Sequence, residues 1–281
     1  MPNAYKDVAI GSSFVIGVLA NGTLVTWGAN KQGQTNIPKA LANTAFKSVS
    51  AGNTFAVALT TSGTVHAWGG TTYNQIAVPT EAKSKVIDIA AGFGHTLALR
   101  SDGKVVAWGK NDYQQSAVPK NLTNVVAVSA GSNYSMALKR DGTVVVWGAA
   151  EMRTEAVKSL RTVVAISAGY NHALALRADG SVVAWGNNDY GQATVPASRY
   201  VVRTISAGLN YSILVTDDNK IFSFGTNNWG QRNIPDTLSN VLSATAGYAN
   251  SVVTLRDGTV LTYGSKEFNA HITRTPTPKG R

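Results

Sequence analysis

An aromatic residue followed by glycine recurs at a nearly constant interval along the chain. The seven pairs are Trp27-Gly28, Trp68-Gly69, Trp108-Gly109, Trp147-Gly148, Trp185-Gly186, Phe224-Gly225 and Tyr263-Gly264, and 38 to 41 residues separate one from the next. A second glycine keeps the same interval, at Gly11, Gly52, Gly92, Gly131, Gly169, Gly208 and Gly247. Two markers with one period indicate a tandem repeat, and repeats of about forty residues form solenoids, propellers or arrays.

Each unit contains three short apolar runs, exemplified in different units by Val125–Ala130, Thr96–Leu99 and Val105–Trp108. The marker glycine separates the first run from the second, and a two-residue turn separates the second from the third. The turns are Asn21-Gly22, Ser62-Gly63, Asp102-Gly103, Asp141-Gly142, Asp179-Gly180, Asp218-Asn219 and Asp257-Gly258. Because these residues tolerate a positive φ, the pattern predicts a β-hairpin in every unit.

A polar loop follows the aromatic-glycine pair and ends in Gln with Ile-Pro or Val-Pro. The segment recurs at 34–38, 75–79, 115–119, 192–196 and 231–235. Proline confines it to an outer edge strand or a connector without strand structure. Unit four, at Ala149–Val157, has neither the Gln nor the Pro, so we expect an irregular outer connector there.

Three or four strands per unit, with no helical period, predict an all-β fold, namely a seven-bladed β-propeller. The expected domain spans 4–273, with units at about 4–43, 44–84, 85–123, 124–161, 162–200, 201–239 and 240–273. We expect residues 266–273 to complete the last blade beside the first and seal the ring. The Thr/Pro-rich run 274–281 indicates an extended linker of the kind that joins extracellular modules.

The unit Val-Val-Ala-Val-Ser-Ala-Gly, followed by an aromatic residue or His, Leu-Ala-Leu, Asp-Gly and Val-Val-Ala-Trp-Gly, resembles the regulator of chromosome condensation repeat over nearly the whole chain. This resemblance implies a propeller that binds proteins. The eukaryotic founder of the family, a nucleotide exchange factor for a small GTPase, has longer repeats and a protruding wedge, for which no unit here has room. The compact unit is similar to that of a bacterial secreted propeller that inhibits class A β-lactamases, which implies inhibitor-like binding.

Composition narrows the function classes. A chain with 44% hydrophobic and 14% charged residues is globular, and without cysteine it has no disulfide framework, thiolate zinc site or thiol nucleophile. No apolar run reaches the roughly eighteen residues of a membrane span. The N-terminal residues lack a signal-peptide pattern. From the Thr/Pro-rich run and the resemblance, we nevertheless expect a secreted bacterial protein, part of a longer modular chain, whose signal peptide lies outside this sequence. The net charge of +10 favours acidic partners.

The four histidines are the first candidates for chemistry. His95 and His172 occupy the same place in two units, where a metal or acid-base pair facing the channel is one hypothesis. The favoured alternative is a structural position that prefers a hydrogen-bonding ring. The other units place Phe14, Phe55, Tyr134, Tyr211 and Asn250 there, and a metal site needs three or four converging ligands. With no other catalytic constellation visible, we expect no enzyme activity, cofactor or metal. The repeated tryptophans are expected to pack between blades.

The loops carry the main functional prediction. If the first strand of each unit runs upward, the loops after the marker glycine and after the aromatic-glycine pair share one face. The predicted partner-binding residues in them are Tyr73, Phe93, Tyr113, Met152, Tyr170, Tyr190, Trp229, Tyr248 and Phe268. Such residues among small polar neighbours are typical of protein interfaces, although each could instead cap its own blade. The expected partner of this monomer is another protein, with a β-lactamase-like enzyme as one candidate.

Basic residues gather at the opposite end of the units, where an acidic polymer or nucleic acid is the alternative partner. The candidates are Lys83, Lys85, Lys139, Arg140, Arg161, Arg199 and Arg203. A solvated face that gives solubility also explains them. Salt dependence separates the two functions, because counterion release weakens binding to phosphates steeply as salt rises.

Overall fold

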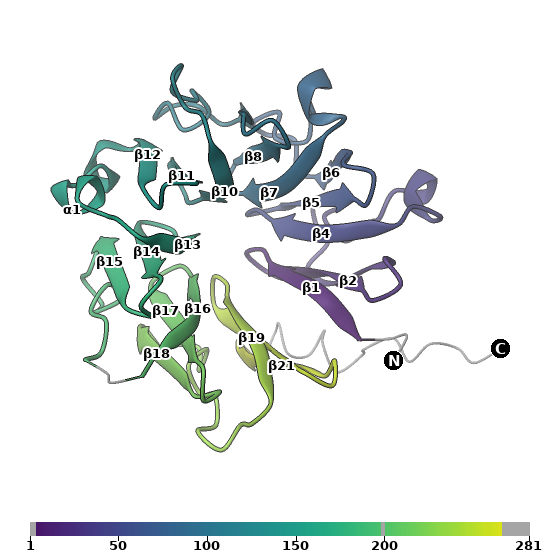
Figure 1. The fold of residues 1–281 in the computed structure, drawn as a ribbon. Helices are drawn as coiled ribbons and strands as arrows, with labels where there is room; N and C mark the ends of the chain where they lie inside the picture. Colours follow the sequence, from purple (N-terminus) through teal and green to yellow (C-terminus); the bar gives the residue numbers. More distant parts are fainter. Residues whose placement is uncertain (1–3, 198–199, 266–281) are drawn as a thin grey trace.

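The computed structural model describes residues 4–197 and 200–265, which form seven three-stranded antiparallel sheets around a central channel (Figure 1). This is the predicted all-β, seven-bladed propeller. Strands that line the channel are β1 (Tyr5–Ile10), β4 (Phe46–Ala51), β7 (Val86–Ala91), β10 (Val125–Ala130), β13 (Val163–Ala168), β16 (Val202–Ala207) and β19 (Val241–Ala246). Each is the first strand of its sheet. Blade one comprises β1 to β3, and the blades are numbered along the chain.

The other two strands of each blade lie progressively further out. The middle strands are β2 (Phe14–Leu19), β5 (Phe55–Thr60), β8 (His95–Arg100), β11 (Tyr134–Lys139), β14 (His172–Arg177), β17 (Tyr211–Thr216) and β20 (Asn250–Leu255). The outer strands are β3 (Leu24–Gly28), β6 (Val65–Gly69), β9 (Val105–Gly109), β12 (Val144–Gly148), β15 (Val182–Gly186), β18 (Ile221–Gly225) and β21 (Val260–Gly264).

The hairpins between middle and outer strands are confirmed, but their loops have three residues rather than two. In blade one, Leu19 N donates to Thr23 O and Gly22 N donates to Leu19 O, which closes a tight turn followed by Gly22 at a φ of +86°. Only the last loop residue needs a positive φ in this arrangement. Blade six places Asn219 there, at a φ of 66°, because Asn tolerates the left-handed region.

The core lies between blades. Each middle strand is covered by neighbouring blades, so β5 and β8 are almost continuously buried instead of alternating between core and solvent. In one cluster, Phe55 and Leu59 of blade two pack with Val86 and Ala98 of blade three. Burial of such side chains stabilises the folded state by about 1.5 to 3 kcal/mol each.

The repeated tryptophans join neighbouring blades, as predicted. The indole N–H of Trp68 donates to Gln34 O of the preceding blade at 3.1 Å, and Trp108 repeats the contact with Gln75 O at 2.8 Å. A buried indole requires such an acceptor. Trp185 uses Met152 O instead, since blade four lacks the Gln.

Side chains of one blade satisfy the inner edge of the next. Ser50 Oγ accepts from Ala91 N of the following blade at 2.9 Å, and the carboxylate of Asp7 accepts from Val49 N at the same distance. Exposed N–H groups on an edge strand would otherwise invite pairing with another chain. Burial is the largest influence on the Asp7 carboxyl and raises its pKa, while the backbone hydrogen bonds lower it.

The outer connectors of blades one, two and four contain short helices, and no connector among the described residues contains a fourth strand. The helices are η1 (Lys39–Leu41), η2 (Thr80–Ala82), and in blade four η3 (Ala150–Met152) and α1 (Glu155–Lys158). The irregular connector predicted for unit four is confirmed. In the described ranges, no helix is both long and apolar enough to cross a bilayer.

Blades seven and one meet directly, because β1 contacts β19 and β20. The segment 266–273, expected to seal this junction, and the linker 274–281 lie outside the described residues, so both remain predictions. Trp27 of blade one has a buried indole N–H without a partner in the described part of the chain.

Candidate functional site

The two ends of the propeller differ in the parts they expose. The inner strands end at the marker glycines on one end, which we call the top face, and the loops after the outer strands lie there too, since Ala29 N donates to Ser13 O. The hairpin loops lie at the other end, the bottom face, where Gly22 O accepts from Phe46 N at the start of the next inner strand. The predicted sorting of the loops is therefore confirmed.

Three aromatic side chains meet at the channel mouth on the top face. Phe93, Tyr170 and Tyr248, from blades three, five and seven, each follow a marker glycine. Their rings contact edge to face, with centroid distances of 6.0 Å between Phe93 and Tyr170 and 6.3 Å between Tyr170 and Tyr248. They border a hollow of about 150 Å³ whose walls are mainly alanine and glycine. The mouth is thus a shallow apolar depression with an aromatic rim.

Backbone hydrogen bonds between blades hold this rim in place. Phe93 N donates to Gly131 O at 3.1 Å, and Tyr170 N donates to Gly208 O at 3.0 Å. Equivalent bonds link each blade to the next from blade one to blade seven. A partner therefore meets side chains on a fixed backbone, which reduces the entropy lost on binding.

Lys110 organises a second aromatic group that adjoins the first. Its ammonium lies 5.4 Å from the ring centroid of Tyr73, 5.8 Å from that of Phe93 and 5.9 Å from that of Tyr113. Attraction between a cation and the faces of aromatic rings stabilises such groups. The ammonium also donates to Asn133 Oδ1 at 3.2 Å. Lys110 was not among the predicted site residues, although no other unit has a basic residue directly after the aromatic-glycine pair.

Buried glutamines fix the loops that carry the outer aromatic residues. Gln115 Oε1 accepts from Tyr113 N, and the same contact joins Gln231 to Trp229. These hydrogen bonds fix the backbone of the aromatic residues and leave their side chains exposed to solvent. Tyr113, Tyr190 and Trp229 are accordingly 51%, 57% and 46% exposed.

Met152 is a correction to the predicted binding residues. Its side chain is 1% exposed and packs with Trp185 and Leu160 in the core of blades four and five. Without the Gln-Pro pattern, the connector of blade four turns inward and uses Met152 to fill the gap. Phe268 lies outside the described residues. The other seven predicted residues lie in top-face loops, five of them in the two aromatic groups and Tyr190 and Trp229 further out.

The two histidines of the repeated slot are structural. His95 Nε2 lies 2.9 Å from Ser135 Oγ of the next blade, and His172 Nε2 lies at the same distance from Ser212 Oγ. Burial, with a smaller contribution from the charge of Lys110, lowers the pKa of His95 to about 3. Burial lowers the pKa of His172 to about 4. No group of three or more potential metal ligands occurs among the residues that the structure describes.

These histidines predict a pH dependence of stability. Unfolded histidine has a pKa near 6.5, so between about pH 6.5 and 3 the unfolded chain binds more protons, and the free energy of unfolding falls as the pH falls. The double variant His95→Phe/His172→Phe places at both positions the residue that blade one has there, Phe14. Its free energy of unfolding should fall less steeply as the pH falls. Urea unfolding at pH 7, 5.5 and 4 measures both slopes, and equal slopes would contradict the assignment.

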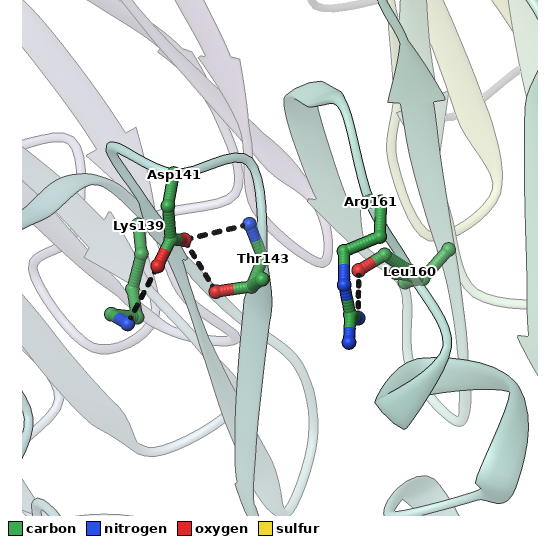
Figure 2. Close-up of polar contacts among 5 residues, drawn as sticks. All are labelled: Lys139, Asp141, Thr143, Leu160 and Arg161. Atoms are coloured by element: carbon green, nitrogen blue, oxygen red, sulfur yellow. Dashed lines mark hydrogen bonds and ion pairs between the residues drawn. The ribbon is translucent and has the colours of Figure 1, made fainter.

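The basic residues of the predicted polyanion site differ in whether their charged groups already have a partner within the protein. Lys139 Nζ lies 2.9 Å from a carboxylate oxygen of Asp141, and the Arg161 guanidinium donates to Leu160 O at 2.7 Å (Figure 2). Arg203 bonds backbone carbonyls of β19. Lys83, Lys85 and Arg140 are exposed and form no ion pair within the described ranges, whereas Arg199 lies outside those ranges.

Fold and repeat together define a class of protein: a seven-bladed propeller in which each blade comes from one unit of about forty residues. The model of the regulator of chromosome condensation (RCC1) repeat matches at 5–34, 46–75, 86–115, 125–150 and 163–192, just over half of the chain. The chain belongs to the RCC1 repeat family. A comparison with curated protein sequences gives no match.

Solved structures with the same fold come from several organisms. The CRINKLY WD40 ectodomain of the Arabidopsis thaliana receptor kinase ACR4 is 20% identical, with a TM-score of 0.73 over 93% of this chain and 95% of that one. The Physcomitrella patens CR4 ectodomain is 18% identical, with a TM-score of 0.77 over 93% and 73% of the two chains. Prp20p from Saccharomyces cerevisiae, which binds Gsp1p and histones, is 18% identical, with a TM-score of 0.71 over 94% and 84%. Identities this low establish the fold alone.

Proposed function

We propose that this chain is a non-enzymatic protein-binding module that docks a partner through the aromatic loops of its top face. The contact of Phe93, Tyr170 and Tyr248 around the channel mouth carries the proposal. Aromatic residues are enriched in the energetically dominant centres of protein interfaces. The binding of Gsp1p and histones by Prp20p supports a protein as the class of partner.

Exposure favours binding over capping for the outer loop residues. A side chain that caps a blade is buried by it, as Met152 is, whereas Tyr113, Tyr190 and Trp229 leave about half of their surface in solvent. Their backbones, not their rings, make the hydrogen bonds to the buried glutamines. The rings therefore add surface that a partner can bury.

The test compares affinity and stability in four variants, Tyr73→Ala, Tyr113→Ala, Tyr190→Ala and Trp229→Ala. Together they should weaken partner binding by several kcal/mol, at about 2 kcal/mol for each dominant anchor, and should leave the unfolding midpoint nearly unchanged. Partners are first captured from the secreted fraction of the source organism and identified, and affinity is then measured with the purified partner. A class A β-lactamase, assayed for inhibition, tests the inhibitor-like hypothesis directly.

The matched control changes Lys83, Lys85, Lys139 and Arg140 to Ala on the bottom face. It should alter only association that depends on salt. Lower stability of the aromatic variants without selective loss of affinity would show that the rings cap blades. Binding lost only in the control set, and falling steeply with salt, would support the polyanion binder instead.

A further inference from the structure

Every inner strand contains a β-bulge at its second residue. The pairing with the middle strand shifts register between the first and third residues in all seven blades. The seven bulge residues are Lys6, Lys47, Ile87, Val126, Val164, Arg203 and Leu242. We call them the bulge ring. Because the inner strands begin at the bottom face and each contacts the next, the bulge ring lies at the bottom end of the strands that surround the channel.

Four members of the bulge ring expose aliphatic side chains. Ile87 is 47% exposed, Val126 39%, Val164 54% and Leu242 39%. Bulges re-aim side chains, often at the rims of closed sheets and beside binding sites. Ile87, Val126 and Val164 hold the same register on three successive strands in contact, β7, β10 and β13. We call these three residues the apolar arc. Contiguous apolar patches exposed on soluble proteins mark interaction sites.

The other three members are basic and occupy blades one, two and six. None of them forms an ion pair within the described ranges, in contrast to Arg100, Lys139 and Lys220 of the hairpins, which pair with turn aspartates. The Arg203 guanidinium donates to Leu242 O at 2.7 Å, which holds the cation beside the bulge residue of blade seven without neutralising it.

Two acids lie near these cations, because Asp7 is close enough to Lys6, and Asp88 to Lys47, for their charges to interact. Asp7 and Asp88 follow two bulge residues directly, and their partly buried carboxylates accept hydrogen bonds from backbone N–H groups of the next blades, those of Val49 and Val128. Lys6 is exposed to solvent. The bulge ring is therefore aliphatic in blades three to five, whereas the other blades carry Arg203, Lys6 and Lys47, with Leu242 between Arg203 and Lys6.

We propose that the bulge ring binds an acidic peptide segment with aliphatic side chains, contributed by a partner protein and separate from the top-face site. The aliphatic side chains would contact Ile87, Val126 and Val164, and the carboxylates would face Lys6, Lys47 and Arg203. Charge complementarity selects this occupant, because a basic or neutral segment would leave the cations unpaired.

The probe is a fluorescein-labelled eight-residue peptide of alternating Asp and Leu, titrated by fluorescence anisotropy. It should bind roughly tenfold or more tightly than two controls, one alternating Asp and Ser and one alternating Lys and Leu. Val126→Asp and Lys47→Gln should each weaken binding roughly tenfold, while Val126→Leu retains it. Lys120→Gln, the same charge change on an exposed connector residue, is the matched control and should bind as the unaltered protein does.

Unfolding midpoints of the variants separate loss of binding from loss of fold. Val126 is exposed, so Val126→Asp should remain folded. Absence of binding, equal binding of the three peptides, or binding insensitive to Val126→Asp would each overturn the proposal. A dimer in sedimentation velocity that Val126→Asp dissociates would assign the surface to a second copy instead. Retained peptide binding in the top-face alanine variants separates this site from the proposed function, and its loss there would overturn the inference.

Discussion

Trp147→Ala should destabilise the propeller by about 3 to 5 kcal/mol, the usual cost of truncating a buried tryptophan. Trp147 is 5% exposed, packs with Leu97, Val125 and Val128, and donates its indole N–H to Gln115 O of the preceding blade at 2.9 Å. The variant removes both the packing and the hydrogen bond at one blade interface. Thermal unfolding should show a midpoint lower by roughly 10 °C.

Trp229→Ala is the matched control, because it removes the same side chain from a top-face loop. The backbone N–H of Trp229 donates to the side chain of Gln231, and the residue is 46% exposed. Its loss should shift the midpoint by no more than a degree or two. Equal destabilisation by the two variants would mean that the aromatic loops are part of the core and would weaken the proposed interface.

Gly148→Ala should be nearly as damaging, at about 3 kcal/mol or more. Gly148 has a φ of +98°, and an added Cβ would lie 2.5 Å from Asn133 O and 2.7 Å from Tyr134 Cα. Both the backbone angle and the contact with the neighbouring strand therefore exclude a side chain. Chemical denaturation at constant pH measures the loss.

Gly191→Ala separates the two causes. Gly191 has a φ of +78°, but an added Cβ would have no neighbour within 4 Å. This variant should lose only the cost of the backbone angle, about 1 to 2 kcal/mol. A Gly148→Ala variant no less stable than Gly191→Ala would show that the β12 backbone shifts to accept a methyl group.

The fold could be predicted from the sequence because the same kinds of structural residue recur in all seven units. Each aromatic-glycine pair supplies a ring for the interface between blades and a backbone angle closed to other residues, and each Asp-Gly or Asn-Gly supplies a hairpin. The three-residue loop was missed because a glycine with positive φ suits both turn lengths. The register shifts of the inner strands have no signal in composition, since Lys6 and Val126 share only a position.

The candidate site was less predictable. Periodicity placed Met152 among the aromatic residues, but the missing Gln in blade four leaves no polar anchor for that loop, and the Met152 side chain turns into the core instead. The group around Lys110 joins residues of different units at contact distances that one sequence does not encode. Features that recur in every unit could be predicted from the sequence. Contacts that arise where one unit departs from the repeat could be found only in the structure.

The glutamine contacts have a consequence for how such a chain can change. Gln75 and Gln115 hold the backbones of Tyr73 and Tyr113 through their side chains, and their own carbonyls accept from the tryptophan of the next blade. The Gln and Trp residues thus hold neighbouring blades together, and the residue two places before each Gln contributes its backbone N–H, not its side chain, to these contacts. Substitutions there can accumulate one loop at a time while the blades stay assembled. The binding specificity of the propeller can therefore change through these loop side chains without any change in the residues that hold the blades together.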